Sequence, residues 1–324
     1  MGNPIEQLLQ AAKLLYAEQQ TDAAISVLRE VVRLDPLNRD AHINLAYALC
    51  RSGDYLNGGL EFLWLWMPVF GDQSGVLASN KNLSGKTFLL SADAGLGDTI
   101  MFSRFAKALR NRNCEVILQV QPQLLRLIQQ SNLADRVIST DDNLPAHDLR
   151  IPLHNLMATL GTEVESMGET TSGYLTSSIQ DRDRFLNQLP IGKQRKVGLC
   201  WQGNPSLPDD SKRSVPLEYI MGLTQQGDHL VSLLPGCPVT SSRPLQWYSL
   251  QNIAETAALI KCLDLVITVD TMVCHLSGAL GIPTILLNRF NGCWRWGDHG
   301  NHSDWYKSMT IKRQRRELVW DTSL

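Results

Sequence analysis

CLDLVITVDTMVCHLSGALGIPTILL, residues 262–287, is the stretch of sequence that decides the fold. Its two apolar, β-branched runs, Leu265–Val269 and Thr284–Leu287, each predict a short buried strand. A helix is expected between them over residues 272–280, because Gly281–Pro283 supplies a stop signal directly afterwards. The stretch is therefore a strand–helix–strand unit, the building block of a parallel sheet.

Polar residues gather where the first of these strands ends. Asp270 and Thr271 are both good N-cap residues, and His275 lies one turn into the helix. Ligands bind in open α/β sheets at this edge, and a helix N-terminus there attracts anions, most often phosphate. The same residues also fit an ordinary helix cap and a packed histidine, so this stretch alone leaves a ligand site and a structural role open.

The composition of the chain indicates a globular protein of two or three domains. It has 324 residues, of which 44% are hydrophobic and 19% charged, and a formal net charge of −2. Without a broad basic field, sequence-independent nucleic-acid binding is not expected. The one basic run, residues 312–316, is interpreted as a solvated helix face.

We expect a cytoplasmic protein without a transmembrane segment. Glu6 and the polar residues 19–22 interrupt any signal-peptide pattern, and the longest apolar run, Phe62–Phe70, is too short to span a bilayer. The seven cysteines are scattered and odd in number, which fits a reduced compartment. No CxxC or HxxxH spacing suggests a metal site, and none is predicted.

Residues 5–70 contain an internal repeat with a period of 34 residues. Ala12 recurs as Ala46, and Leu15 recurs as Leu49. Small residues recur where helices must approach closely, and large ones where they fill the space between. Period and pattern resemble the tetratricopeptide repeat (TPR), which implies two helical hairpins joined by turns.

The second repeat ends in an apolar, aromatic segment, Trp64–Phe70. If this segment were exposed at the end of the repeats, it would form too large an apolar surface, so we expect it to pack on the following domain. TPR helices often form a concave surface for a peptide, which would make a protein or peptide the partner. A structural cap on the following domain explains the repeats equally well.

The next part of the chain alternates strands with helices, which predicts a parallel, doubly wound sheet. The expected strands are Thr87–Ser91, Glu115–Val120, Arg136–Ser139 and Leu149–Leu153, and the expected helices are Thr99–Asn111 and Pro122–Gln130. Gly95 and Gly97 follow the first strand but lack the third glycine of a dinucleotide fingerprint, so NAD is weakly supported. Asp98 at this sheet edge is interpreted either as a general base or as a helix cap.

A second α/β half follows a helix expected over Ile179–Arg195. Its strands are predicted at Lys196–Trp201, His229–Leu234 and the two runs of the opening stretch, with a helix over Asn252–Cys262. Two cations near a helix N-terminus suit a diphosphate. The loops at the strand ends collect the polar candidates of this half: Gln202, Gly203, Asn204, Lys212, Arg213, Gly236, Asp270, Thr271 and His275.

Three segments together resemble the ADP-heptose:lipopolysaccharide heptosyltransferase family, glycosyltransferase family 9. They are Gly95–Asp98, Val197–Asn204 and Asp264–Leu287. The resemblance spans roughly residues 84–310 and implies a GT-B fold, in which two Rossmann-like domains face a cleft. TPR units are joined to such a domain here, as in many bacterial TPR–glycosyltransferase proteins. The resemblance also implies an inverting, metal-independent transfer of a sugar from a nucleotide-diphospho-sugar to a hydroxyl group.

The resemblance also implies roles for individual residues. The family's proposed base falls on Asp98, beside Gly97 of the glycine loop. Its donor-binding residues fall on Asp270, Thr271, His275 and the turn Gln202–Asn204, and its phosphate-neutralising lysine falls on Lys212 or Arg213. These types suit the chemistry, because a leaving nucleoside diphosphate develops negative charge and the attacking hydroxyl needs a base.

The predicted organisation is TPR-like repeats over 1–70, a linker over 71–83, an acceptor domain over 84–190, a donor domain over 191–310 and a tail or helix over 311–324. The first functional hypothesis is an active glycosyltransferase with an unidentified glycan or protein acceptor. The second is a TPR scaffold whose GT-B-like domain is inactive, favoured by Met272 where the family commonly has glycine. The third, an oxidoreductase or other nucleotide enzyme, lacks a complete glycine fingerprint.

Overall fold

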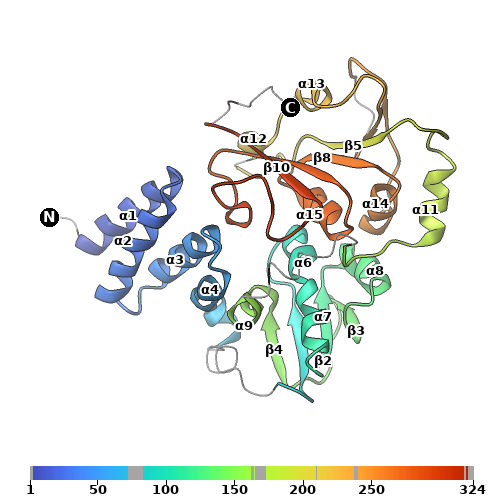
Figure 1. The fold of residues 1–324 in the computed structure, drawn as a ribbon. Helices are drawn as coiled ribbons and strands as arrows, with labels where there is room; N and C mark the ends of the chain where they lie inside the picture. The colour runs from blue at the N-terminus through green and yellow to red at the C-terminus, as the bar shows by residue number, and fades with distance from the viewer. Residues whose placement is uncertain are drawn as a thin grey trace.

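A helical N-terminal part is followed by two parallel sheets in this computed structural model (Figure 1). The structure describes residues 3–71, 83–161, 164, 173–208, 210–236, 240–316 and 319. The predicted linker, apart from its two end residues, lies outside the described residues, as do residues 317, 318 and 320–324.

Four helices form the two predicted repeats: α1 (Pro4–Ala17), α2 (Thr21–Leu34), α3 (Arg39–Arg51) and α4 (Tyr55–Phe70). Asn38 and Asp54 cap α3 and α4 with their side chains, accepting hydrogen bonds from Ala41 N at 3.0 Å and Asn57 N at 3.3 Å. Both caps lie in the turns that lead into these helices. The TPR-like hairpins are thereby confirmed.

Helix α4 packs on the first α/β half, as its aromatic sequence predicted. A side chain at Gly59 would come within 2.4 Å of the backbone of Met157 and Ala158, so only glycine permits this contact. Phe62 is 1% exposed and lies edge-on to the ring of His154. Trp64, in contrast, turns back to its own repeat and stacks on His42 at 4.1 Å.

The first sheet has the strand order β3-β2-β1-β4, with all pairs parallel. Its bounds match the predictions closely: β1 (Thr87–Ser91), β2 (Glu115–Val120), β3 (Arg136–Ser139) and β4 (Leu149–Pro152). Helix α8 (Pro122–Gln130) is as expected, and the short helices η1 (Leu153–Leu156) and α9 (Met157–Leu160) follow β4.

Two helices of this region differ from their predicted extents. The helix expected at 99–111 begins earlier, because Asp98 accepts from Gly95 N and so completes a cap upstream. It is also divided at Ser103 into two helices, α6 (Leu96–Phe102) and α7 (Arg104–Arg110). The helix expected at 179–195 ends as α11 (Ile179–Leu186), four residues before Pro190, which disfavours a helical residue before it.

The second sheet has the order β10-β9-β8-β5-β6-β7, again with all pairs parallel. Its strands are β5 (Lys196–Cys200), β6 (His229–Ser232), β7 (Leu245–Gln246), β8 (Leu265–Val269), β9 (Thr284–Asn288) and β10 (Met309–Arg313). The helices of this half are α12 (Asp210–Arg213), α13 (Leu217–Gly222), α14 (Ile253–Ile260), α15 (Met272–Ala279) and η3 (Trp294–Trp296).

Strand β10 corrects the prediction for the C-terminal segment. Residues 311–324 were expected to form a tail or helix, and the basic run to form a solvated helix face. Met309–Arg313 instead pairs in parallel with β9 and adds an edge strand to the second sheet. Arg313 donates to the carbonyls of Gly297 at 2.9 Å and Gly300 at 2.7 Å, so part of the basic run holds a loop in place.

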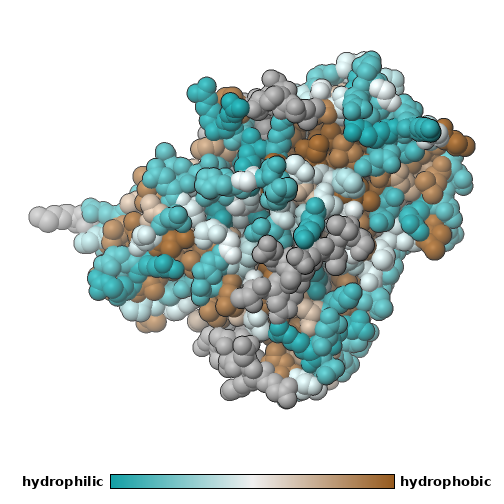
Figure 2. All heavy atoms as spheres, viewed as in Figure 1, coloured by the Kyte–Doolittle hydropathy of each residue, from teal (hydrophilic) through white to brown (hydrophobic). Residues whose placement is uncertain are grey.

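One hydrophobic core joins the second repeat to both sheets. It includes Phe62 of α4, Phe102 of α6 and Trp305 before β10. The rings of Phe62 and Trp305 both pack on Trp294, and Trp305 also packs edge-on against Phe102. Hydrophilic residues cover most of the face in Figure 2, with hydrophobic residues in separate patches. Among the described residues, none of the helices is both long and apolar enough to cross a membrane.

Candidate active site

The predicted donor residues lie at the point where the strand order of the second sheet reverses. Gln202–Asn204 follow β5, and Asp270 and Thr271 follow its neighbour β8. The two strands are parallel, so both segments leave the same carboxyl edge. Open α/β sheets bind ligands in the crevice outside that edge, at this reversal of strand order.

Arg213 links the two sides of this crevice. Its Nη1 donates to the backbone carbonyl of Asp270 at 2.9 Å, and its Nε donates to Asp210 Oδ1 at 2.8 Å. Gly203 lies against this pair, since an added Cβ would be 2.3 Å from Arg213 Nη2 and 2.2 Å from Asp210 Oδ1. Lys212, the alternative phosphate ligand, is exposed beside it.

Thr271 is the N-cap of α15, accepting from Val273 N at 3.3 Å. The positive end of that helix therefore lies at the crevice. Asn204 is used within its own turn, where Oδ1 accepts from Ser206 N at 3.0 Å. Gly236 is exposed after β6 with a φ of 120°, and a Cβ there would meet none of the described residues within 4 Å.

His275 is buried against the next segments of the chain. It is 5% exposed, its Nδ1 is 3.1 Å from the hydroxyl of Tyr306, and its ring stacks on Trp296 at 5.2 Å. Burial lowers the pKa of His275 to about 4, with Arg295 acting in the same direction. The imidazole is therefore neutral at physiological pH and presents a hydrogen-bonding group, not a positive charge.

Asp98 is paired with a residue that sequence reasoning did not select. Arg295, nearly 200 residues later, places its Nη2 in direct contact with Asp98 Oδ1, and Gly95 N donates to Oδ2 at 3.1 Å. Burial raises the pKa of the Asp98 carboxyl, but the charge of Arg295, together with the hydrogen bond from Gly95 N, outweighs it, and the pKa lies below its usual value. Asp98 is thus ionised at neutral pH.

The two α/β halves meet at Gly97 and His275. An added Cβ at Gly97 would be 2.7 Å from His275 Cδ2, so the backbone of α6 lies directly on the imidazole ring of α15. Figure 1 shows α6 below α15 at the junction of the two sheets. Asp98 of the first half and the helix N-terminus of the second are therefore adjacent.

A buried Asp–His pair supports the glycine loop. His154 Nδ1 is 2.9 Å from both carboxylate oxygens of Asp93, and its backbone N–H is 3.3 Å from Oδ2. The side chains are 8% and 2% exposed. Asp93 follows β1 and His154 follows β4, which are neighbours in the first sheet, so this pair fixes the loop that carries Asp98.

The signal that could have identified Arg295 is the sequence Cys293-Trp-Arg-Trp296, an arginine between two tryptophans in a polar segment. The pairing of Asp93 with His154 could not be predicted from the sequence, because it depends on which strands are neighbours in the sheet.

Asp270, Cys274 and His275 place potential metal-ligand atoms within 4.8 Å of one another. The positive charge of Arg295, which acts on both Asp270 and His275, opposes a cation at that position.

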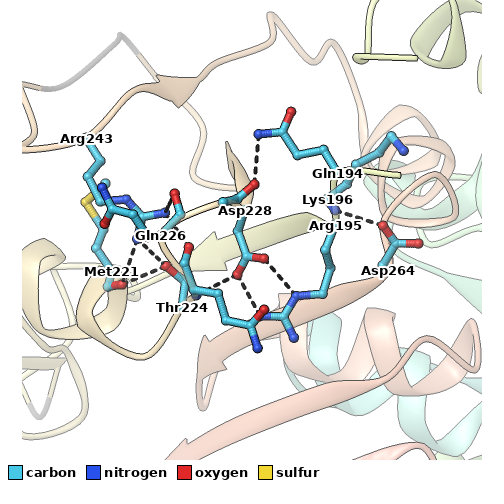
Figure 3. Close-up of polar contacts among 11 residues, drawn as sticks. Gln194, Arg195, Lys196, Met221, Thr224, Gln226, Asp228, Arg243 and Asp264 are labelled. Carbon is cyan, nitrogen blue, oxygen red and sulfur yellow. Dashed lines mark hydrogen bonds and ion pairs between the residues drawn. The ribbon is translucent and has the colours of Figure 1, made fainter. Parts of the chain in front are cut away.

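The opposite, amino edge of the second sheet has a different character (Figure 3). Arg195 forms two hydrogen bonds to Asp228, at 2.9 and 2.6 Å, and Asp264 accepts from Lys196 N at 2.8 Å. Arg243 donates to Thr224 Oγ1 at 2.6 Å. Arg195 and Asp228 neutralise each other, and Asp264 and Arg243 bind backbone and hydroxyl groups, so we interpret this edge as stabilising the loops before the strands.

Comparison with known proteins supports the repeats and the fold. The sequence model of the tetratricopeptide repeat matches residues 5–48, and that of glycosyltransferase family 9 (heptosyltransferase) matches residues 249–300. No curated protein gives a significant match. The family 9 match contains β8, α15 and η3, and thus Asp270, His275 and Arg295.

Several solved structures are similar to this one. A glycosyl transferase family 9 protein from Veillonella parvula is 14% identical, with a TM-score of 0.52, covering 72% of this chain and 87% of that one. The E. coli ADP-heptose LPS heptosyltransferase II is 12% identical, with a TM-score of 0.46, covering 70% and 89%. E. coli heptosyltransferase WaaC with ADP is 15% identical, with a TM-score of 0.43, covering 70% and 91%. The chain thus joins tetratricopeptide repeats to a GT-B-like fold that resembles glycosyltransferase family 9.

Proposed function

We propose that this protein is an inverting, metal-independent glycosyltransferase. It transfers a sugar from a nucleotide-diphospho-sugar to a hydroxyl group of an acceptor, with Asp98 as the general base. The observation that supports the proposal is the contact between Gly97 of α6 and His275 of α15, because Asp98 is next to Gly97 in one half and α15 directly follows Asp270 and Thr271 in the other.

The donor diphosphate binds at the carboxyl edge of β5 and β8. There the N-terminus of α15, capped by Thr271, provides the positive end of a helix dipole. Arg213 crosses from the β5 side to the backbone of Asp270, and Lys212 is exposed next to it. These groups stabilise the negative charge that develops as the nucleoside diphosphate departs, which is the work a metal would otherwise do.

Asp98 takes the proton of the acceptor hydroxyl as its oxygen attacks the anomeric carbon. The bond from that carbon to the diphosphate breaks on the opposite face, so the configuration inverts. Because Arg295 offsets the effect of burial on the pKa of Asp98, the carboxylate is ionised at neutral pH, which is the form that a base requires. Arg295 also fixes its orientation, which makes Arg295 a positioning residue.

A direct test compares the wild type with Asp98→Asn, using labelled nucleotide-diphospho-sugars, a panel of glycan and peptide acceptors, and EDTA. We expect transfer with inverted anomeric configuration, reduced at least about 100-fold in the variant while nucleotide binding persists. Unchanged transfer in Asp98→Asn would remove this carboxylate from the mechanism. Complete dependence on added metal would contradict the proposed chemistry.

A second candidate function is a TPR scaffold with an inactive GT-B-like domain. The observation that favours it is Met272, half-buried at the first position of α15 where a glycine would let phosphates approach the backbone closely. Met272→Gly distinguishes the two. If the protein is an inactive scaffold, the variant shows no turnover, like the wild type. If it is an enzyme whose methionine side chain restricts the donor, the variant binds the donor more tightly and still turns it over.

A further inference from the structure

A cavity of about 540 Å³ lies between the helical repeats and the second α/β half. One wall comes from the turn between α1 and α2, the first turn of α2 and the end of α3. The other wall comes from the segment between residues 295 and 304. Its volume is typical of a small-molecule site.

The inner end of this cavity reaches the candidate active site. Arg295 and Trp296 both line it. Arg295 contacts the carboxylate of Asp98, and Trp296 stacks on His275. A ligand that fills the cavity is therefore separated from Asp98 by one side chain.

The lining is rich in groups that form hydrogen bonds with hydroxyls. Trp296 lines the cavity with a side chain that is 3% exposed and whose indole N–H has no acceptor among the described residues. Amide, hydroxyl, imidazole and carboxylate groups line the remaining wall: Gln19, Gln20, Ser52, His299, His302 and Asp304.

The charges of the cavity oppose an anionic ligand. Three carboxylates and two guanidiniums line it, so the formal excess is negative. Both guanidiniums are already engaged, Arg51 with Asp298 and Arg295 with Asp98. A phosphorylated or carboxylated ligand would therefore be repelled by the carboxylates and would compete with Asp298 and Asp98 for these guanidiniums, whereas a neutral polyhydroxyl ligand finds donors and acceptors throughout.

We propose that this cavity binds the acceptor, and that the acceptor is a neutral glycan. The inference rests on the proposed glycosyltransferase function and deepens it. The first repeat then forms one wall of the acceptor site, in addition to packing as a cap. An acceptor hydroxyl at the inner end displaces the Arg295 guanidinium slightly and reaches Asp98.

The test uses the full chain, saturated with the nucleoside diphosphate that stabilises it most. Binding of neutral methyl glycosides and oligosaccharides is measured by saturation-transfer NMR and titration. Ala23 is exposed and lines the cavity, so Ala23→Trp fills it without removing a polar group. Ala11 is an exposed alanine of α1 outside the cavity lining, and Ala11→Trp is the matched control.

We expect at least one neutral glycan to bind, with affinity at least tenfold weaker in Ala23→Trp and unchanged in Ala11→Trp. Equal affinity in the two variants would overturn the cavity as the acceptor site. If serine- and threonine-containing peptides, added in a parallel arm, show the Ala23 dependence instead, the glycan assignment is wrong. If nucleotide binds and no neutral glycan does, the inference fails while the donor site stands; if no nucleotide binds either, the proposed function fails with it.

Discussion

The guanidinium of Arg295 is in contact with the carboxylate of Asp98, which joins η3 of the second α/β half to α6 of the first. Their side chains are only 12% and 22% exposed, so the pair is largely shielded from solvent and its electrostatic effect is only weakly screened. This contact determines the charge state of the proposed base, and several expectations depend on it.

Removing the charge of Arg295 should change the pH dependence of transfer. In Arg295→Met the pKa of Asp98 rises, because the positive charge that lowers it is gone and burial remains. In a plot of kcat/KM against pH, measured by nucleoside diphosphate release, the acid limb should then move to higher pH. Arg295→Lys keeps a positive charge and should shift the limb less. Identical acid limbs in all three proteins would show that Asp98 is not the titrating base.

The contact between Gly97 and His275 should not tolerate a side chain. Gly97→Ala places a methyl group 2.7 Å from a ring that Trp296 and Tyr306 hold in position, so α6 and α15 must separate. We expect a loss of about 1–3 kcal/mol in unfolding free energy from overpacking, measured by urea denaturation, together with reduced transfer.

The matched control for this prediction is Gly222→Ala, where an added Cβ meets nothing within 4 Å and φ is not positive. It should leave stability unchanged or slightly increased, because alanine restricts the unfolded chain. Similar losses in both variants would contradict the close packing of the two halves.

Burial of His275 should make stability depend on pH. Its pKa is about 4 in the folded protein against about 6.5 in the unfolded chain, so between these values the unfolded state binds more protons. The contribution of the neutral, buried His275 to the free energy of unfolding is fully present above pH 6.5. It decreases as the pH falls towards 4, by roughly 3 kcal/mol in total. Urea denaturation between pH 7.5 and 4.5 measures this decrease, which should be smaller in His275→Gln; equal slopes would refute a buried neutral imidazole.

Asp298 should hold the repeats to the second α/β half. Its carboxylate accepts from Thr21 of α2 and contacts Arg51 of α3, whose side chain is 1% exposed. Asp298→Asn leaves a buried guanidinium without its counter-charge, and we expect a loss of about 3 kcal/mol in unfolding free energy. Glu30→Gln removes a partner of the exposed Arg33 and should have no measurable effect on thermal unfolding. If both variants unfold like the wild type, this contact does not hold the repeats in place.

Most strands were predictable because each is a local apolar run. The bounds of β1, β2, β3 and β8 coincide with the predicted ones. Strand β10 was missed because its alternating sequence, MTIKR, looks like part of a basic tail until β9 provides a partner for it. The order of the strands, which places the loops after β5 and β8 side by side, is a tertiary property that no single segment carries.

The candidate site was predictable in part for the same reason. Motif positions such as Asp98 and Asp270 are local and could be selected from the sequence. The partners that decide their chemistry are distant in the chain: Arg295 contacts Asp98 across the junction of the halves, and Tyr306 fixes the ring of His275. The burial that keeps His275 neutral likewise depends on packing between segments, which sequence spacing does not reveal.

The most direct test of the central claim is thermal unfolding against ADP, GDP, UDP, CMP and their sugar conjugates. One nucleoside diphosphate at about 100 times its dissociation constant should add about 2.7 kcal/mol of stability. That gain should disappear in Asp270→Ala, at the carboxyl edge of β8, and persist in Asp264→Asn, at the amino edge of the same sheet. Stabilisation by none of these ligands would contradict a nucleotide-sugar site between β5 and β8.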